Sequence, residues 1–401
     1  MKRRLLIIGN GMCGLRLLEE LTAVAADHFE TTVIGAETMP AYNRVLLSPL
    51  LAGDLSPADV ELRPADWYAK NGITLRIGQP VVTLDMHQRT VVLGDGTCVP
   101  FDICVLATGS EPIRLPLPGS ELDGVVTFRS LQDAYALRGA GQAKREAVVI
   151  GGGLLGIEAA YGLVRAGASV TLVHLVDRLM ERQLDPEAAL LLSKALEGKG
   201  IPVVLGTTAL AIHGQDRVQS VELTDGRRLD CELVVMAVGV RPSIAPARRA
   251  GLETNRGILV DDRLATSAEG IFALGECAEH RGQCYGLIEP GYEQAKVLAR
   301  HLAGRPDIYE GSVAATNLKV SGIPVFSAGE FDDAQAESIV LEDRVAAIYR
   351  KLVIRDGRLI GAVLYGDTSE ALWYRQLIGQ RAPISSIRGA LAFGKAYAEA
   401  A

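Results

Sequence analysis

Three glycines near the start of the chain have the spacing of a phosphate-binding loop. Gly9, Gly11 and Gly14 form G-x-G-x-x-G directly after the apolar run 5–8, and a helical pattern follows. Glycines here let the chain turn sharply and let the backbone approach a pyrophosphate, while the helix N-terminus adds the positive end of its dipole. Glu37 lies 23 residues beyond Gly14, about where a ribose-binding carboxylate is expected. The predicted chemistry is dinucleotide binding.

The same pattern returns later in the chain. An apolar run at 147–150 leads into a second G-x-G-x-x-G, and 169–173 has the character of the next strand. His174 follows that strand, in the place where an acid might stand. The glycines of this second motif are Gly151, Gly153 and Gly156.

An internal repeat accompanies the two motifs. Residues 91–109 and 221–239 align without a gap, and both contain an Asp-Gly turn and a closing apolar strand. Two copies of a dinucleotide-binding unit are a stronger signal than either glycine motif alone. We predict cofactor contacts at the ends of the closing strands, by Ala107, Thr108, Gly109 and Gly239.

A third strand pattern at 266–276 ends in the pair Gly275 and Glu276. Because it follows the second copy, we expect it to close the first domain, which the second would then interrupt. The fold class is therefore α/β, with two Rossmann-like dinucleotide-binding domains. The region after 314 predicts an antiparallel hairpin and a helix, and hence a small α+β domain for packing or subunit contact.

These elements give four segments with expected boundaries. The first and third form one domain, the second is the other dinucleotide domain, and the fourth is the α+β domain. The segments are 1–111, 112–240, 241–313 and 314–401.

Composition narrows the function classes. The 401 residues carry a net charge of −7, with 48% hydrophobic and 22% charged residues, as in ordinary globular proteins. This acidity argues against nucleic-acid binding, and no apolar run approaches the roughly 18–20 residues that span a membrane. The six cysteines form no C-x-x-C and the six histidines show no ligand spacing, so we predict no metal site. We expect a cytoplasmic protein.

Across residues 1–312 the chain resembles the FAD-dependent pyridine nucleotide-disulfide oxidoreductase superfamily. The resemblance implies that the first glycine motif and Glu37 bind FAD, and that the second motif binds NAD(P)H. It implies that 266–276 is the second FAD motif. Glu276 stands where most members carry an Asp that holds the ribityl chain; Glu keeps the acceptor chemistry and reaches further.

Three segments carry a narrower resemblance, to the flavoprotein portion of NAD(P)H-dependent nitrite reductases and to the electron-transfer subunit of assimilatory nitrate reductases. They are 42–48, 180–185 and 275–292. Complete nitrite reductases carry cysteine-rich iron–sulfur and sirohaem parts. The present residues hold no such cysteines, so we expect that they do not reduce nitrite by themselves.

The region 37–55 contains no cysteine, whereas the disulfide-reductase branch of the family places a redox cysteine pair there. Thiol chemistry in that region is thus excluded, and the flavin itself must be the redox centre. Flavin accepts two electrons together and releases them singly, which suits a link from NADH to one-electron carriers. No side-chain acid or base is demanded, and we name no catalytic residue.

For several charged residues the resemblance implies a role that competes with a plain structural one. For Glu158 the resemblance implies a place near the nicotinamide, and the structural alternative is a carboxylate that interacts favourably with the dipole of its helix. We favour the place near the nicotinamide. Arg44 contacts the flavin nucleotide or is a solvated surface residue. Glu289 faces the isoalloxazine or simply begins a helix.

His174 bears on the choice of nicotinamide cofactor. An acid at this position would favour the ribose diol of NADH and an arginine the 2′-phosphate of NADPH, whereas a neutral histidine excludes neither. Arg178 and Arg182 could meet a phosphate. We favour NADH, with NADPH as the alternative.

The resulting hypothesis is an FAD-dependent NADH dehydrogenase subunit for a partner nitrate or nitrite reductase. A rubredoxin or ferredoxin reductase is the close alternative, and a flavin-binding NADH sensor or scaffold is the alternative of another class. An NADH oxidase is disfavoured, because such enzymes usually carry a cysteine near 42–48. A homodimer is permitted by the C-terminal domain, and the net acidity suggests a partner with a basic patch.

Overall fold

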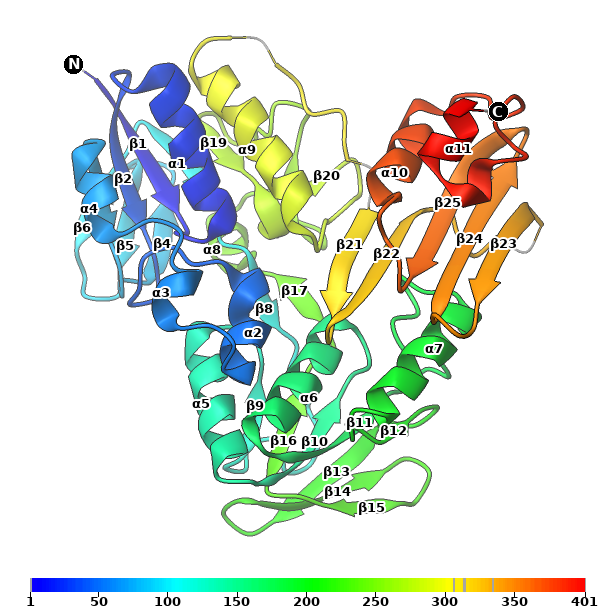
Figure 1. Cartoon of the computed structure of the whole chain (residues 1–401). Helices are drawn as coiled ribbons and strands as arrows, with labels where there is room; N and C mark the ends of the chain where they lie inside the picture. The colour runs from blue at the N-terminus through cyan, green and yellow to red at the C-terminus, as the bar shows by residue number, and fades with distance from the viewer. Residues whose placement is uncertain (1, 306, 313–314, 334, 401) are drawn as a thin grey trace. The chain divides into compact units, whose positions relative to one another are not determined.

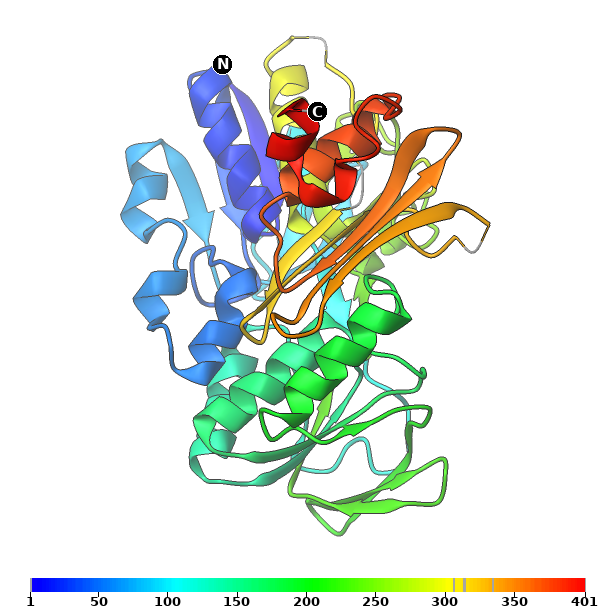
Figure 2. The ribbon, with the colours of Figure 1, turned by 45° about the vertical axis from the view of Figure 1, so that its right-hand side comes forward.

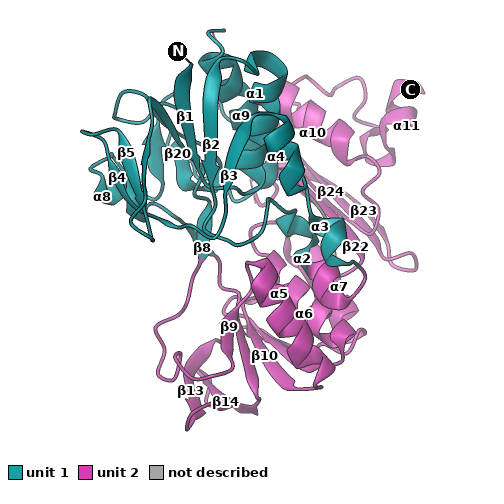
Figure 3. Ribbon diagram, turned by 90° about the vertical axis from the view of Figure 1, so that its left-hand side faces the viewer, with its two compact units in different colours: residues 1–47, 55–111, 240–312 teal, residues 48–54, 112–239, 313–401 magenta. Residues whose placement is uncertain are grey.

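The computed structural model describes residues 2–305, 307–312, 315–333 and 335–400. The chain divides into two compact units, which Figure 3 shows in different colours. Unit 1 comprises 1–47, 55–111 and 240–312, and unit 2 comprises 48–54, 112–239 and 313–401.

Unit 1 is built on a five-stranded parallel sheet. Its central strand β1 (Arg3–Ile8) is buried on both faces from Leu5 to Ile8, as expected for a parallel sheet covered on both sides. Leu5 and Ile7 pack in the core with helices α1 (Met12–Ala25) and α9 (Ile288–Leu302). The strand order is β19 (Ile271–Ala273), β7 (Ile103–Leu106), β1, β2 (Phe29–Ile34) and β3 (Ile73–Arg76).

The strand β19 confirms that one dinucleotide domain interrupts the other. It pairs with β7 although it lies beyond the whole second glycine motif in sequence. The opposite face of the sheet, with Leu6 and Ile8, packs on a small antiparallel sheet and α8. Further elements are β4 (Val81–Asp85), β5 (Thr90–Leu93), β6 (Cys98–Pro100), β18 (Ile258–Val260), β20 (Ala278–His280), α3 (Pro57–Val60), α4 (Ala65–Lys70) and α8 (Ala245–Arg249), and the paired strands β8 (Ser110–Pro112) and β17 (Val240–Pro242).

Unit 2 contains a second five-stranded parallel sheet with the same arrangement. The repeated sequence segments form matching elements, β5-β6-β7 in unit 1 and β14-β15-β16 in unit 2. The sheet order is β12 (Val203–Val204), β11 (Ser169–Val173), β10 (Glu146–Ile150), β16 (Leu233–Met236) and β9 (Val125–Thr127). The antiparallel strands are β13 (Ala209–Gly214), β14 (Val218–Leu223) and β15 (Arg228–Asp230).

The helices of this dinucleotide fold have identifiable starts. Ser130 and Asp133 form a reciprocal capping box at α5, and the Asp185 carboxylate caps α7 by accepting the Ala188 N–H at 3.2 Å. The short helix α2 (Leu47–Ala52) places Leu51 against Gly162 of α6. The helix bounds are α5 (Leu131–Gln142), α6 (Leu154–Ala166) and α7 (Pro186–Glu197).

The last part of unit 2 is an α+β fold, as the sequence predicted (Figures 1 and 2). Five antiparallel strands form a sheet, and α10 (Ala371–Gln380) buries Tyr374 and Ile378 in the core beside it. A short helix α11 (Lys395–Ala400) lies near the end of the chain. The strand order is β21 (Ala315–Val320), β22 (Ile323–Gly329), β25 (Arg358–Tyr365), β24 (Ile348–Arg355) and β23 (Glu337–Asp343).

Candidate dinucleotide sites

The first glycine loop joins β1 to α1, and each of its glycines has a distinct reason. Gly9 has φ +117°, and a Cβ there would lie within 3.0 Å of the Ala107 carbonyl oxygen. A Cβ on Gly14 would lie equally close to the Gly9 carbonyl oxygen. Gly11, by contrast, would place its Cβ in open space. Two glycines thus serve close packing, and the third leaves the backbone open to an approaching pyrophosphate.

The second loop, between β10 and α6, repeats this geometry. Gly151 has φ +118°, and its added Cβ would meet the carbonyl oxygen of Ala237. A Cβ on Gly156 would meet the carbonyl oxygen of Gly151, and one on Gly153 would meet nothing within 4 Å. Both loops therefore have the backbone shape that a dinucleotide pyrophosphate fits.

Glu37 lies just beyond β2, where its carboxylate is engaged by two neighbours. The Tyr42 hydroxyl donates to Oε2 at 2.7 Å, and the Arg44 guanidinium forms an ion pair with Oε1. The same guanidinium lies 5.1 Å from the centre of the Tyr42 ring. Arg44 is thus bound to protein groups rather than freely solvated. The three side chains form one cluster at the carboxyl end of the strand, where a ribose-binding acid belongs.

Asn10 is a loop residue that the sequence reasoning missed. The Tyr68 hydroxyl donates to its Oδ1 at 3.0 Å, while its Nδ2 is buried without a hydrogen-bond partner among the described residues. A buried amide donor without a partner is costly unless a ligand or water completes it. A bound dinucleotide would supply such an acceptor, so the loop fits FAD. The only sequence signal was a polar side chain inside the glycine motif.

The ends of β7 and β19 bring the other predicted contacts of unit 1 to the same edge of the sheet. The Ser110 hydroxyl donates to Glu276 at 2.8 Å, so the carboxylate is held at the loop that follows β7. Thr108 donates to the Ser243 carbonyl oxygen at 2.7 Å, and Gly109 adopts φ +68°. Glu289 lies in the first turn of α9.

Close packing of α1 against α9 explains Cys13. A Cβ added to Gly291 or Gly275 would lie within about 3.0 Å of its sulfur. Cys13 is therefore a small residue in a tight contact between the two helices. This geometry keeps both helix N-termini beside the loop that carries Glu276.

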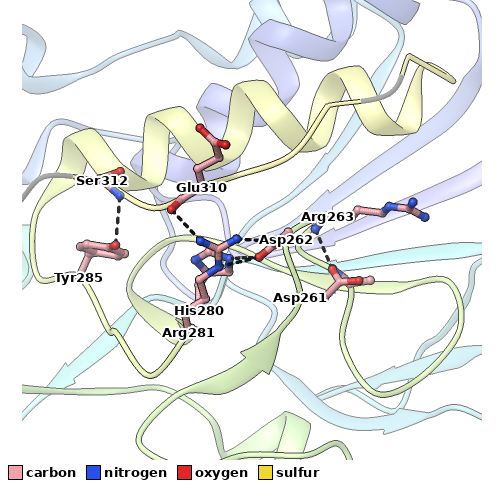
Figure 4. A network of polar contacts seen from close by, with 9 residues as sticks. Asp261, Asp262, Arg263, His280, Arg281, Tyr285, Glu310 and Ser312 are labelled. Atoms are coloured by element: carbon pink, nitrogen blue, oxygen red, sulfur yellow. Dashed lines mark hydrogen bonds and ion pairs between the residues drawn. The ribbon is translucent and has the colours of Figure 1, made fainter. Parts of the chain in front are cut away.

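A polar network, drawn in Figure 4, fixes the connection between β20 and α9. The buried His280 contacts Asp262 through Nε2 at 2.8 Å, and Arg281 forms a bidentate ion pair with the same carboxylate. The Arg281 guanidinium, followed by His280, lowers the pKa of Asp262 to about 2. The Tyr285 hydroxyl accepts the Ser312 N–H at 3.1 Å. No motif or residue spacing in the sequence indicates this network.

Glu158 lies in the first turns of α6, where its carboxylate binds a segment far away in sequence. It accepts the backbone N–H of Ser321, at the turn between β21 and β22, at 2.6 Å. Burial raises the pKa of Glu158 above its ordinary value, and hydrogen bonds from Ser321 and Ser48 offset part of that rise. The carboxylate thus links the glycine-motif helix to the C-terminal sheet, a role that the sequence did not predict.

The variant Glu158→Gln tests this buried acid. Because the folded state holds its proton to higher pH than the unfolded state, the free energy of unfolding falls as pH rises above about 4.5. Glutamine keeps an oxygen for Ser321 and removes this fall. We expect the stability of the variant relative to wild type to rise between about pH 4 and about pH 7, by about 1.4 kcal/mol for each unit by which folding raises the pKa. Urea unfolding at both pH values measures it; a pH-independent difference would contradict the prediction.

The ring of His174 is buried and turned toward the second glycine loop. Its Nδ1 accepts the Gly152 N–H at 3.0 Å, and its Nε2 lies 3.1 Å from Glu181. Of the two arginines considered for a phosphate, Arg178 pairs with Asp332 at 2.9 Å and Arg182 is exposed.

Comparison with known proteins identifies the family of this chain. Residues 3–301 match the family model described as pyridine nucleotide-disulphide oxidoreductase. The chain belongs to this family. Residues 315–382 match the rubredoxin NAD+ reductase C-terminal domain. The family binds FAD and NAD(P)H, and its members are oxidoreductases, which agrees with the doubled dinucleotide fold.

Two curated relatives from Bacillus subtilis (strain 168) are similar over most of this chain. The nitrite reductase [NAD(P)H] is 45% identical over 386 residues, covering 96% of this chain and 48% of the relative. The assimilatory nitrate reductase electron transfer subunit is 43% identical over 371 residues, covering 92% of this chain and 48% of that relative. The chain thus spans about half the length of these relatives.

Among solved structures, the ferredoxin reductase for the CYP199A2 system from Rhodopseudomonas palustris superposes with a TM-score of 0.87 at 28% identity. The match covers 98% of this chain and 100% of that one. The predicted fold class and family are therefore confirmed. Within the part of the chain that the structure describes, no helix has the length and apolarity to cross a membrane. The same described residues contain no group of three potential metal ligands.

Proposed function

We propose that this chain oxidises NADH through bound FAD and passes the electrons to a partner nitrate or nitrite reductase. The observation that carries the proposal is the similarity to the two Bacillus subtilis proteins across more than nine-tenths of this chain. The doubled loop geometry supports it, since two dinucleotides must be bound for electrons to pass from one to the other.

In this proposal the carboxyl edge of the unit 1 sheet holds FAD. The chemistry that FAD supplies once bound is acceptance of two electrons from NADH and their release one at a time. Gly11 leaves the backbone open to the pyrophosphate, Asn10 offers its Nδ2 as a donor, and Glu37 offers a carboxylate to the ribose. The other proposed FAD contacts are Gly9, Gly14, Arg44, Ala107, Thr108, Gly109, Gly275, Glu276 and Glu289.

The nicotinamide cofactor is assigned to unit 2. Gly153 leaves its loop open to the pyrophosphate, and Gly151 and Gly156 let α6 pack closely against that loop. Glu158, His174 and Gly239 are the further proposed contacts. NADH rather than NADPH is the proposed donor.

The cysteines support a flavin-based redox centre. The region 37–55 contains no cysteine, whereas the disulfide-reductase branch of the family carries its redox pair there. Burial raises the pKa of the Cys104 and Cys277 thiols, and raises that of Cys231 to about 12, so these three are poor nucleophiles near neutral pH. The thiol–disulfide step that names the family is no part of the proposed mechanism.

The test is anaerobic stopped-flow mixing of the purified yellow protein with NADH and, separately, with NADPH, followed by exposure to air. We expect rapid bleaching of the flavin band with NADH and slow recovery in air. Recovery should be slow because the proposed electron acceptor is a protein and not oxygen. Rapid recovery in air would indicate an oxidase. Absence of bleaching with either nucleotide would overturn the dehydrogenase proposal and leave a sensor or scaffold.

A rubredoxin or ferredoxin reductase is the second candidate. It is favoured by the match of residues 315–382 to the rubredoxin NAD+ reductase C-terminal domain and by the superposition on a ferredoxin reductase. Steady-state NADH oxidation with each acceptor protein in turn separates the candidates. Faster turnover with a rubredoxin or ferredoxin than with a nitrate or nitrite reductase would favour the second.

A further inference from the structure

The segment after β11 folds back onto the second glycine loop. The N–H of Met180 donates to the Gly152 carbonyl oxygen at 3.0 Å, and the Met180 side chain is fully buried. Its backbone takes φ +51°, a left-handed conformation that is unusual for a residue with a side chain. The N–H groups of Gln183 and Leu184 both donate to the Met180 carbonyl oxygen at 2.8 Å. The tight turn fixes the next residue, Glu181, close to the loop.

His174 provides the second link between the loop and Glu181. A backbone N–H only donates, so the contact from Gly152 makes Nδ1 of the ring an acceptor. The proton of the neutral ring is then on Nε2, which faces Oε2 of Glu181 at 3.1 Å. A Cβ added to Gly152 would lie 2.6 Å from Cγ of the ring, so the imidazole is packed directly on the loop.

Glu181 keeps one carboxylate oxygen available. Its side chain is 31% exposed, against 10% for His174. Apart from the histidine, no hydrogen-bond or ion-pair partner of Glu181 is found within the described ranges of the chain. The carboxylate therefore lies at the carboxyl end of β11, beside the phosphate-binding loop, where dinucleotide folds place the adenosine ribose.

The neighbouring cations are less well placed for a phosphate. Arg178 pairs with Asp332 through Nη2 at 2.9 Å, and its Nε is buried without a hydrogen-bond partner among the described residues. The remaining cation in the turn, Arg182, is exposed. A 2′-phosphate placed against the Glu181 carboxylate would meet like charge, whereas a ribose diol would donate hydrogen bonds to it.

We propose that Glu181 binds the adenosine ribose diol of NADH and is the residue that selects NADH over NADPH, with His174 positioning its carboxylate. The inference rests on the proposed binding of NAD(P)H at the second glycine motif. Glu181 lies seven residues after the position that directly follows β11, where dinucleotide folds usually place the ribose-binding acid. His174 occupies that position, and its contact with Glu181 holds the carboxylate at the site.

The test is calorimetric titration of the FAD-loaded protein with ADP-ribose and with 2′-phospho-ADP-ribose, which need no catalysis. Wild type should bind ADP-ribose more tightly. Because charge-assisted hydrogen bonds are lost, Glu181→Gln should weaken ADP-ribose binding about 10- to 100-fold and reduce the preference. Glu181→Asp should recover part of the affinity. Glu197→Gln, an equal charge change at an exposed position of α7, should change neither dissociation constant.

His174→Asn separates positioning from folding. Asparagine keeps an acceptor for the Gly152 N–H, and its shorter side chain places no donor at the position of Nε2. It should lower the preference for ADP-ribose, measured as the dissociation constant of 2′-phospho-ADP-ribose divided by that of ADP-ribose. Loss of packing at His174 would lower the melting temperature but would not by itself change this preference.

Three results would overturn the inference, and they are distinguishable. If wild type prefers ADP-ribose and Glu181→Gln behaves like Glu197→Gln, the assignment of Glu181 fails and the proposed function stands. If wild type prefers the 2′-phosphate, the assignment fails together with the proposal of NADH as the donor, and only the flavin-dependent electron transfer stands. If the yellow wild type binds neither fragment, the proposed function of the second motif fails together with the inference.

Discussion

Replacing Gly14 by alanine is expected to yield a protein that is purified without its yellow cofactor. The added Cβ would lie within 3.0 Å of the Gly9 carbonyl oxygen, a backbone atom that cannot rotate away. The start of α1 must then move from the loop that receives the pyrophosphate. A backbone shift of this kind costs about 1–3 kcal/mol, so FAD affinity should fall by up to about 100-fold.

The ratio of flavin absorbance to protein absorbance measures this loss, and titration of the apoprotein with FAD gives the affinity. Gly139→Ala is the matched control, because its Cβ on α5 would meet nothing within 4 Å. Alanine there should be neutral or should stabilise the helix by up to about 1 kcal/mol. Full flavin content in Gly14→Ala would mean that FAD does not depend on the first loop.

Local spacing was sufficient to predict the frame of both sites. The alternation of strand, glycine loop and helix identified β1 and β10, because these features lie within about 15 consecutive residues. The internal repeat predicted two copies of one unit, and the two parallel sheets have the same strand arrangement. The interrupted domain was predicted from one strand pattern that follows the second copy, and β19 pairs with β7 in the sheet of unit 1. These inferences needed only short-range pattern and parallel-sheet topology.

Contacts that depend on irregular backbone could not be predicted in this way. Glu181 reaches His174 only because Met180 adopts a left-handed conformation in a turn without glycine. Glu158 meets Ser321 across 163 residues, and no periodicity connects the two. The Asn10 Nδ2 is buried without a hydrogen-bond partner among the described residues, while the amide oxygen accepts from Tyr68, 58 residues away in sequence. In each case the chemistry follows from tertiary packing rather than from residue spacing.

Replacing Gly156 by alanine is expected to give the opposite result to Gly14→Ala, a yellow protein that NADH no longer bleaches. The new Cβ would press on the Gly151 carbonyl oxygen in the second loop, while the first loop is unchanged. By the same backbone argument, ADP-ribose affinity and the rate of flavin reduction at subsaturating NADH should fall by up to about 100-fold. Calorimetry and anaerobic stopped-flow absorbance measure the two quantities.

Gly153→Ala is the informative comparison for this variant. Its Cβ would meet no protein atom within 4 Å, so the melting temperature should not change, yet the methyl group would occupy the side left open to the pyrophosphate. Loss of ADP-ribose binding in both variants, with a lowered melting temperature only in Gly156→Ala, would separate ligand clash from loop distortion. If Gly156→Ala were colourless and Gly14→Ala yellow, the assignment would be reversed, with FAD bound at the second loop and NADH at the first. Because the two loops have the same backbone shape, only this pair of opposite outcomes assigns FAD to one and NADH to the other.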